Sequence, residues 1–307
     1  MHKEIEKYLA DLLPELQKAG IAIDEQQEID YGVQIRVSRH HYKSILNIYY
    51  SQKKGISTVP MGLNNPLKKL LSDLCFLQEE LDLKMPPIHN WNAWIGSDEC
   101  GKGDYFGPLI VCAFAFERKQ EKEFKNIGVM DSKKLKTDDI YRIAKYLYKN
   151  YANCINCIVL KPEKYNELIA KFKQQGKSLN DLLAWLHSTA IMDLQKKHPE
   201  SEGALVDQFS NAQKVWRALK EKKFPLPCIE RTGAEVDFAV AAASIIARYQ
   251  FLESFAAMRE FYQLNFPQGS QRIVIKFAQD FIHQYGEKRL GEVAKLHFKT
   301  TNQISTS

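Results

Sequence analysis

Hydrophobic residues in the N-terminal part of the chain follow two different periods. Over residues 5–16 apolar residues recur with helical spacing, which predicts an amphipathic helix. Over residues 32–39 apolar and polar residues alternate, which predicts a strand with one buried face. Two further strands and a second helix are expected at residues 44–50, 55–59 and 66–83. This part is therefore expected to form a small sheet with two helices.

A segment with two adjacent prolines ends this pattern. Because proline lacks an N–H and fixes φ, it does not continue a helix, and residues 84–90 are expected to be a linker. We therefore expect two domains, residues 1–90 and 91–307. In the second, apolar runs alternate with amphipathic helices, which indicates an α/β fold. Strands are expected at residues 93–98, 106–116, 154–160, 204–209 and 227–231, and helices at residues 137–149, 162–173, 179–197, 212–222 and 234–262 and after residue 271.

Composition and length are those of an ordinary globular protein. The chain has 307 residues, of which 45% are hydrophobic and 26% charged. The longest apolar uncharged runs, residues 106–116 and 238–247, are much shorter than the ~20 residues that span a bilayer. The N-terminus lacks the apolar stretch of a signal peptide. We expect a cytoplasmic protein without a membrane segment, and a monomer, since no heptad repeat is present.

The six cysteines form neither a disulfide framework nor a zinc motif. Cys154 and Cys157 make a C-x-x-C, but a structural zinc site needs a second ligand pair. Residues three apart on a strand also face opposite sides. The other four lie among apolar neighbours and are interpreted as reduced thiols in or near the core: Cys75, Cys100, Cys112 and Cys228.

Charge is distributed unevenly along the chain. The formal net charge is +6, and residues 91–307 hold 32 of the 43 basic and 25 of the 37 acidic residues. Residues 31–72 contain seven basic residues and no acidic one. Such a run is usually a solvated face, but strand alternation places Arg36 and Ser38 together on the side away from the core. We therefore expect Arg36 and Lys43 to belong to a surface that binds phosphates.

The most informative chemistry lies in residues 94–108. An apolar strand ends in adjacent carboxylates, Asp98 and Glu99, and a Gly-Lys-Gly turn follows at residues 101–103. Mg²⁺ takes oxygen ligands, and glycines let backbone N–H groups approach a ligand closely. Because neighbours on a regular strand face opposite sides, the two carboxylates converge only if the strand twists or ends there. The pair Asp24-Glu25 has no such surroundings and is interpreted as surface.

Three further acidic residues stand at the ends of predicted elements. Asp207 ends a short apolar strand, where it could also cap the helix that follows. Glu235 and Asp237 lie at the start of a helix that is apolar nearly all round and therefore buried. Acidic residues there suit the helix dipole, and a buried helix could also direct one of them into a metal site.

The run Gly-Ser-Asp-Glu-Cys-Gly-Lys-Gly-Asp-Tyr-Phe-Gly-Pro at residues 96–108 resembles the signature of type 2 ribonucleases H, and within that family of ribonuclease HIII. Residues 131–135, 239–248 and 294–301 support the resemblance. It implies an RNase H-like mixed sheet flanked by helices in residues 91–307. It also implies that residues 1–90 form a small α+β domain that resembles the TATA-box-binding protein. This domain is expected to bind the substrate.

The resemblance further implies hydrolysis of the RNA strand of RNA–DNA hybrids by two divalent ions, Mg²⁺ or Mn²⁺, giving 3′-hydroxyl and 5′-phosphate ends. The catalytic metal ligands carried over are Asp98, Glu99, Asp207 and Asp237, with Glu235 as the alternative for the fourth. The substrate-binding residues carried over are Gly101, Lys102, Gly103, Ser132 and Lys133. Two alternatives remain open: incision at single ribonucleotides in DNA, as in ribonuclease HII, and hybrid binding without catalysis.

Overall fold

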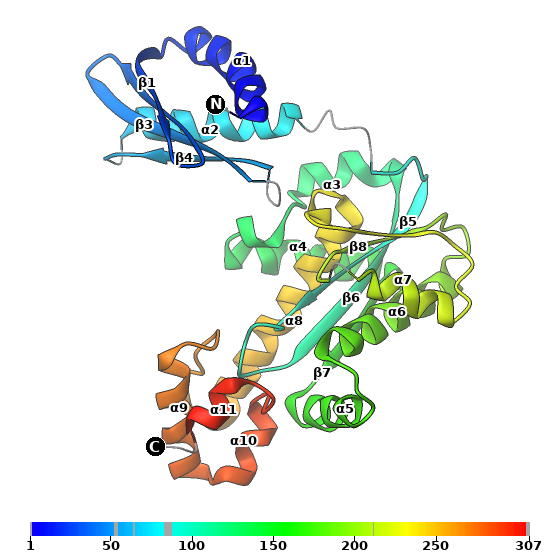
Figure 1. The fold of residues 1–307 in the computed structure, drawn as a ribbon. Helices are drawn as coiled ribbons and strands as arrows, with labels where there is room; N and C mark the ends of the chain where they lie inside the picture. The colour runs from blue at the N-terminus through cyan, green and yellow to red at the C-terminus, as the bar shows by residue number, and fades with distance from the viewer. Residues whose placement is uncertain (1, 52–54, 64, 83–87, 211, 305–307) are drawn as a thin grey trace. The chain divides into compact units, whose positions relative to one another are not determined.

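The computed structural model describes residues 2–51, 55–63, 65–82, 88–210 and 212–304. These form two compact units, Met1–Asn90 and Trp91–Ser307, drawn in Figure 1. Of the expected linker, residues 84–87 lie outside the described part. No helix in the described ranges is long and apolar enough to cross a membrane.

The N-terminal unit is a four-stranded antiparallel sheet of order β1-β2-β3-β4 with two helices. Its elements are α1 Lys3–Lys18, β1 Ala22–Ile29, β2 Gly32–Arg39, β3 Tyr42–Ser51, β4 Gly55–Met61 and α2 Pro66–Asp82. Strand β1 was not expected from the sequence. It is a polar edge strand with no buried residue, so it lacks the alternation by which the other strands were recognised.

Both helices of this unit pack on one face of its sheet. Ile35 of β2 and Leu46 of β3 lie in one hydrophobic cluster with residues of α1 and α2. Because side chains alternate along a strand, the residues between them point to the other face of the sheet. Arg36 is one of these, and it pairs in register with Glu25 of β1. The small α+β architecture expected for this part is confirmed.

The second unit contains a mixed five-stranded sheet of order β7-β6-β5-β8-β9. Strands β5, β6 and β7 are antiparallel neighbours, whereas β5, β8 and β9 run parallel. The strands are β5 Ala93–Cys100, β6 Leu109–Glu117, β7 Ile155–Leu160, β8 Ala204–Asp207 and β9 Cys228–Arg231. The expected mixed sheet flanked by helices is confirmed.

Helices cover both faces of this sheet. The α-helices are α3 Glu121–Ile127, α4 Thr137–Tyr151, α5 Pro162–Gln174, α6 Leu179–Lys197, α7 Lys214–Glu221, α8 Phe238–Tyr262, α9 Arg272–Tyr285, α10 Glu287–Val293 and α11 Lys299–Ile304. Helix α6 packs on the face formed by Val111 and Ala113. Helix α8 lies on the opposite face, where a Cβ at Gly96 would come within 2.2 Å of the Ala239 backbone. Glycine at this position therefore allows α8 to lie directly on β5.

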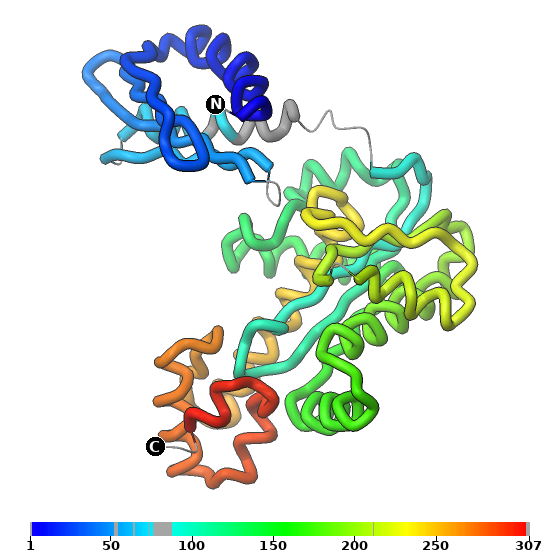
Figure 2. Tube along the Cα trace, viewed as in Figure 1, coloured from blue at the N-terminus to red at the C-terminus, as the bar shows by residue number. Residues whose placement is uncertain are grey.

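The C-terminal helices hold the turn between β5 and β6. Phe106 of this turn forms a backbone bridge with Ala294. Figure 2 shows the C-terminal segment beside the turn. Lys295 is fully buried, and its Nζ donates to the carbonyls of Phe106, Gly107 and Pro108 at 3.3, 2.6 and 3.4 Å. Burial lowers the pKa of Lys295 to about 7.

One expectation about the cysteines is corrected. Cys112 of β6 and Cys157 of β7 are opposite each other in the antiparallel register and form a disulfide, so Cys112 is not a reduced thiol. Residues directly opposite on such strands point to the same face, which the spacing along one strand does not reveal. The remaining described cysteines are free: Cys75, Cys100, Cys154 and Cys228.

Candidate active site

Acidic side chains gather where two parallel strands end. Ser97 of β5 is level with Val206 of β8, so Asp98 and Asp207 follow at the same end of neighbouring strands. Asp207 Oδ1 accepts hydrogen bonds from the N–H groups of residues 233 and 234, both at 3.1 Å. These bonds bring Glu235, in the short 3-10 helix Ala234–Val236, beside Asp207.

The clustering changes the protonation of these groups. Burial, and then the negative charge of Glu99, raise the pKa of Asp98 from 3.8 to about 8. Burial and the charge of Glu235 raise the pKa of Asp207 from 3.8 to about 6. Nearby cations would lower both values, because they stabilise the ionised forms.

Asp98 and Glu99 are held from opposite sides of the sheet. The Ser244 hydroxyl of α8 donates a hydrogen bond to Asp98. Glu99 lies instead against α6, where His187 Nε2 is 3.2 Å from its Oε2. Burial alone would raise the pKa of Glu99, but the hydrogen bond from His187 and the nearby Lys102 lower it below its usual value.

Asp237, expected as the fourth acidic ligand, has a different position. Its Oδ1 accepts from the indole Nε1 of Trp94 at 3.0 Å and from the N–H of Ala239 at 2.9 Å. It is therefore the N-cap of α8. Trp94 lies four residues before Asp98 on β5, about 13 Å along the strand. The alternative, Glu235, is the acidic residue next to Asp207.

The Gly-Lys-Gly turn follows directly after Glu99. Gly101 has a φ of 86°, and a Cβ there would lie 2.2 Å from the Pro108 carbonyl oxygen, so the turn itself requires this glycine. At Gly103 a Cβ would meet no described protein atom within 4 Å. Lys102 Nζ lies 3.5 Å from Glu99 Oε1 and 4.9 Å from the centre of the Phe209 ring.

Lys133 and Ser132 differ in their exposure. Lys133 Nζ is 3.6 Å from Glu235 Oε1, and its side chain is 70% exposed. Burial alone would lower the pKa of Lys133, but the surrounding carboxylates, Glu235 first, raise it. Ser132 is buried, with its hydroxyl 2.8 Å from that of Ser244, and its carbonyl accepts from Arg248. Ser132 therefore contacts residues that surround the carboxylates and is not exposed to a substrate.

The oxygen ligands of this cluster suit a hard divalent cation. Glu235 Oε2 is buried and has no hydrogen-bond partner, and the pKa values of Asp98 and Asp207 are raised first by burial and then by neighbouring negative charge. In the described ranges no group of three or more Asp, Glu, His or Cys side chains is arranged so that it could hold a metal ion. The carboxylates are thus neighbours whose oxygen atoms would have to move closer together to bind an ion.

Sequence reasoning missed two side chains of the site, His187 and Phe209. His187 is a fully buried residue of the mostly apolar helix α6. A buried imidazole needs polar partners, so a histidine in a mostly apolar helix was the signal in the sequence for a buried polar contact. The sequence does not say which residues those partners are, because Glu99 is 88 positions away in the chain.

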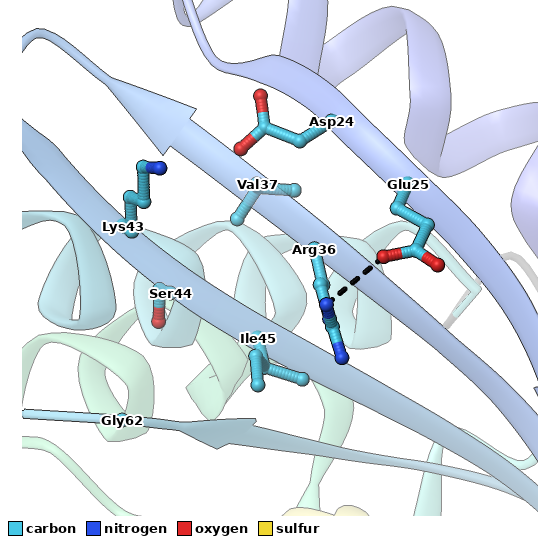
Figure 3. A pocket seen from close by; sticks show the side chains of 8 residues that line it. All are labelled: Asp24, Glu25, Arg36, Val37, Lys43, Ser44, Ile45 and Gly62. Carbon is cyan, nitrogen blue, oxygen red and sulfur yellow. Dashed lines mark ion pairs between the residues drawn. The ribbon is translucent and has the colours of Figure 1, made fainter.

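The outer face of the N-terminal sheet is less basic than expected. Arg36 Nη1 is 3.0 Å from Glu25 Oε2, and the Ser38 hydroxyl donates to Asp24 at 2.7 Å. Asp24, Glu25, Arg36 and Lys43 line a hollow of about 470 Å³, shown in Figure 3. Asp24 and Glu25 are surface residues as interpreted, but they belong to β1 and partly neutralise this face. Lys53 and Lys54 of the basic run lie outside the described residues.

Comparison with known proteins gives consistent matches. Residues 95–301 match the family model described as Ribonuclease HII. A ribonuclease HIII of Protochlamydia amoebophila is 39% identical over 211 residues, covering 68% of this chain and 67% of the relative. One of Bacillus cereus is 39% identical over 214 residues, with the same coverage. The crystal structure of Bst-RNase HIII in complex with Mn²⁺ superposes with a TM-score of 0.63 at 26% identity, covering 96% of both chains.

Proposed function

Because the chain belongs to the ribonuclease HIII group of the ribonuclease HII family, we propose that it cleaves the RNA strand of RNA–DNA hybrids. The observation that carries the proposal is the cluster of carboxylates at the ends of β5 and β8, directly before a Gly-Lys-Gly turn. Carboxylates that only capped helices would not need to share a buried site. Hybrid binding without catalysis is therefore the less favoured function.

We propose that Asp98, Glu99, Asp207 and Glu235 hold the metal. Two Mg²⁺ or Mn²⁺ ions bound there would supply the positive charge that neutralises the phosphodiester and activates water, and the products would have 3′-hydroxyl and 5′-phosphate ends. The chain's own contribution is to keep these carboxylates together. The backbone bonds to Asp207, the Ser244 bond to Asp98 and the His187 bond to Glu99 serve this purpose.

Recognition of RNA is assigned to the turn of Gly101, Lys102 and Gly103. The 2′-hydroxyl distinguishes RNA from DNA at a given site. The open space beside Gly103 supports close approach of a sugar to the backbone. Lys133, exposed beside Glu235, is assigned to a phosphate of the substrate.

The N-terminal unit is assigned to binding the hybrid through Arg36 and Lys43. Both line the hollow on the outer sheet face, which neither α1 nor α2 covers. Phosphate contacts of this kind give affinity without sequence preference. We also propose that the protein acts as a monomer in the cytoplasm, which light scattering of the free protein and fractionation of cells would test.

The test is cleavage of a labelled RNA–DNA hybrid and of a duplex with one ribonucleotide, each in Mg²⁺ and in Mn²⁺. We expect wild type to cut the hybrid and leave the second duplex intact, and Asp207→Asn to lose hybrid cleavage. Incision of the single-ribonucleotide duplex would favour the ribonuclease HII-like alternative. Binding without cleavage in either metal would contradict the proposed activity.

A further inference from the structure

The side chain of Glu99 leaves the strand on the opposite side from that of its neighbour Asp98. Successive residues on a strand face opposite sides, and Asp98 points toward α8. Glu99 starts from the α6 side and has to be directed back toward the end of the strand. Its carboxylate is nearly buried, with 12% of the side chain exposed, so a group on α6 is needed to orient it.

His187 is that group. Its Nε2 lies 3.2 Å from Glu99 Oε2 and, since an ionised carboxylate only accepts hydrogen bonds, the imidazole donates. Its Nδ1 lies 2.8 Å from the Ser97 hydroxyl oxygen, which is itself 2.8 Å from the Cys112 carbonyl oxygen. The imidazole thus links the strand backbone to the carboxylate, and its two nitrogens fix its orientation.

Phe209 fixes the plane of the imidazole. Its ring stacks on His187 with centroids 5.3 Å apart and 23° between the planes. Lys102 Nζ lies near the same phenyl ring, 4.9 Å from its centre. One aromatic ring therefore contacts both residues that hold Glu99, of which His187 binds Oε2 and Lys102 lies by Oε1.

We propose that His187, supported by Ser97 and Phe209, is a positioning residue that sets the Glu99 carboxylate for metal binding and leaves Oε1 as the oxygen available to the ion. The two contacts of Glu99 support this division. The bond to His187 is buried, whereas Lys102 is one-third exposed and 3.5 Å away, a contact that an ion can replace. The inference rests on the proposed role of Glu99 as a ligand.

Two substitutions of His187 separate positioning from packing. In His187→Gln the amide reaches the place of Nε2 and can still donate to Glu99, whereas in His187→Asn it reaches only the place of Nδ1. The control is His198→Gln at the end of the same helix, whose ring contacts Glu200 and the Asn153 carbonyl instead. Circular dichroism and thermal melts establish that each variant folds.

The main readout is Mn²⁺ binding to the free protein, measured from the paramagnetic resonance signal of unbound Mn²⁺. We expect His187→Asn to weaken binding about ten- to a hundredfold, the usual effect of removing a group that orients a ligand. His187→Gln and His198→Gln should stay within about threefold of wild type. The Mn²⁺ concentration that gives half-maximal hybrid cleavage should shift in the same order.

Equal Mn²⁺ affinity of the Asn variant and wild type would overturn the proposal, as would equal losses in the Asn and Gln variants. If His187→Asn does not fold, Phe209→Leu replaces it, because that change removes the stack and keeps the imidazole. We expect Phe209→Leu to weaken Mn²⁺ binding about three- to tenfold, and no change would contradict the proposal. If wild type binds Mn²⁺ but cleaves no hybrid, the proposed function fails while the binding comparison still decides the role of His187.

Discussion

Two regions of this chain pair acidic with basic side chains, and they differ in burial. On the outer sheet face Arg36 and Glu25 are 54% and 51% exposed. At the ends of β5 and β8, Glu99 is 12% exposed and its partner His187 is fully buried. Exposed charge pairs are screened by water and stabilise a protein by about 0–1 kcal/mol. A buried carboxylate cannot exchange its protein partner for water, so its position is fixed. Paired charges are therefore part of the solvated surface in the first region and of the candidate active site in the second.

The sharpest contrast within the buried region is between Glu235 and Asp237. We expect Glu235→Gln to lower the rate of hybrid cleavage about a thousandfold, equivalent to ~4 kcal/mol, since it removes a metal ligand. Asp237→Ala removes the N-cap of α8. It should lower the free energy of unfolding by about 1 kcal/mol and leave the rate within a few-fold of wild type. Single-turnover kinetics and thermal melts measure both, and a reversed pattern would return the ligand role to Asp237.

Removing the N-terminal unit, which contains the exposed charge pairs, tests whether it contributes to binding and not to catalysis. Deletion of residues 1–90 should weaken hybrid binding about ten- to a hundredfold and change the single-turnover rate at saturating enzyme much less. The dependence of affinity on salt should also become shallower, because phosphate contacts are lost. Fluorescence anisotropy at several salt concentrations gives both quantities. Equal losses in binding and in the chemical step would contradict this separation of roles.

Neutralising a buried carboxylate should stabilise the metal-free protein. We expect Asp98→Asn in EDTA to raise Tm by about 2–4 °C for each kcal/mol of repulsion removed. The pKa of Asp98 is raised from 3.8 to about 8, so the folded state retains a proton that the unfolded chain has lost. The stability that this group contributes therefore falls as pH rises from about 4 to 8. Melts between pH 5.5 and 8 should show a decline that is smaller in Asp98→Asn, and equal slopes would contradict the raised pKa.

The smallest effect is expected on the outer sheet face. Glu25→Gln releases Arg36 and should raise hybrid affinity about two- to fivefold at low salt. The salt slope should steepen by up to about one unit if Arg36 then contacts a phosphate. Glu6→Gln on α1 makes the same charge change away from this face and serves as the control. Equal gains in the two variants would mean that only net charge matters.

Apolar patterns along the sequence predicted most of the fold. Some expected elements bury one face, as β2 does, and others bury nearly all of their residues, as β6 does. Strand β1 has no buried residue, and it was missed. The two compact units divide between Asn90 and Trp91. The Cys112–Cys157 pair depends on the register between strands, which residues along a single strand do not reveal.

The site was predictable where it is contiguous in the chain. Asp98, Glu99 and the glycine turn follow one another, so a motif reveals them. The choice between Glu235 and Asp237 depends on where α8 begins, a difference of two residues that helix patterns do not resolve. His187 reaches Glu99 across 88 positions of sequence, and only the packing of α6 on the sheet brings the two together.

The buried side chain of Lys295 has a consequence for how the protein is made. It fastens the turn after β5 from a position 189 residues further along the chain. At about 5–20 residues per second, a ribosome needs about 10–40 s to cover that distance. A nascent chain therefore carries Asp98 and Glu99 long before the turn beside them is secured. The turn is therefore secured only after residue 295 has been made.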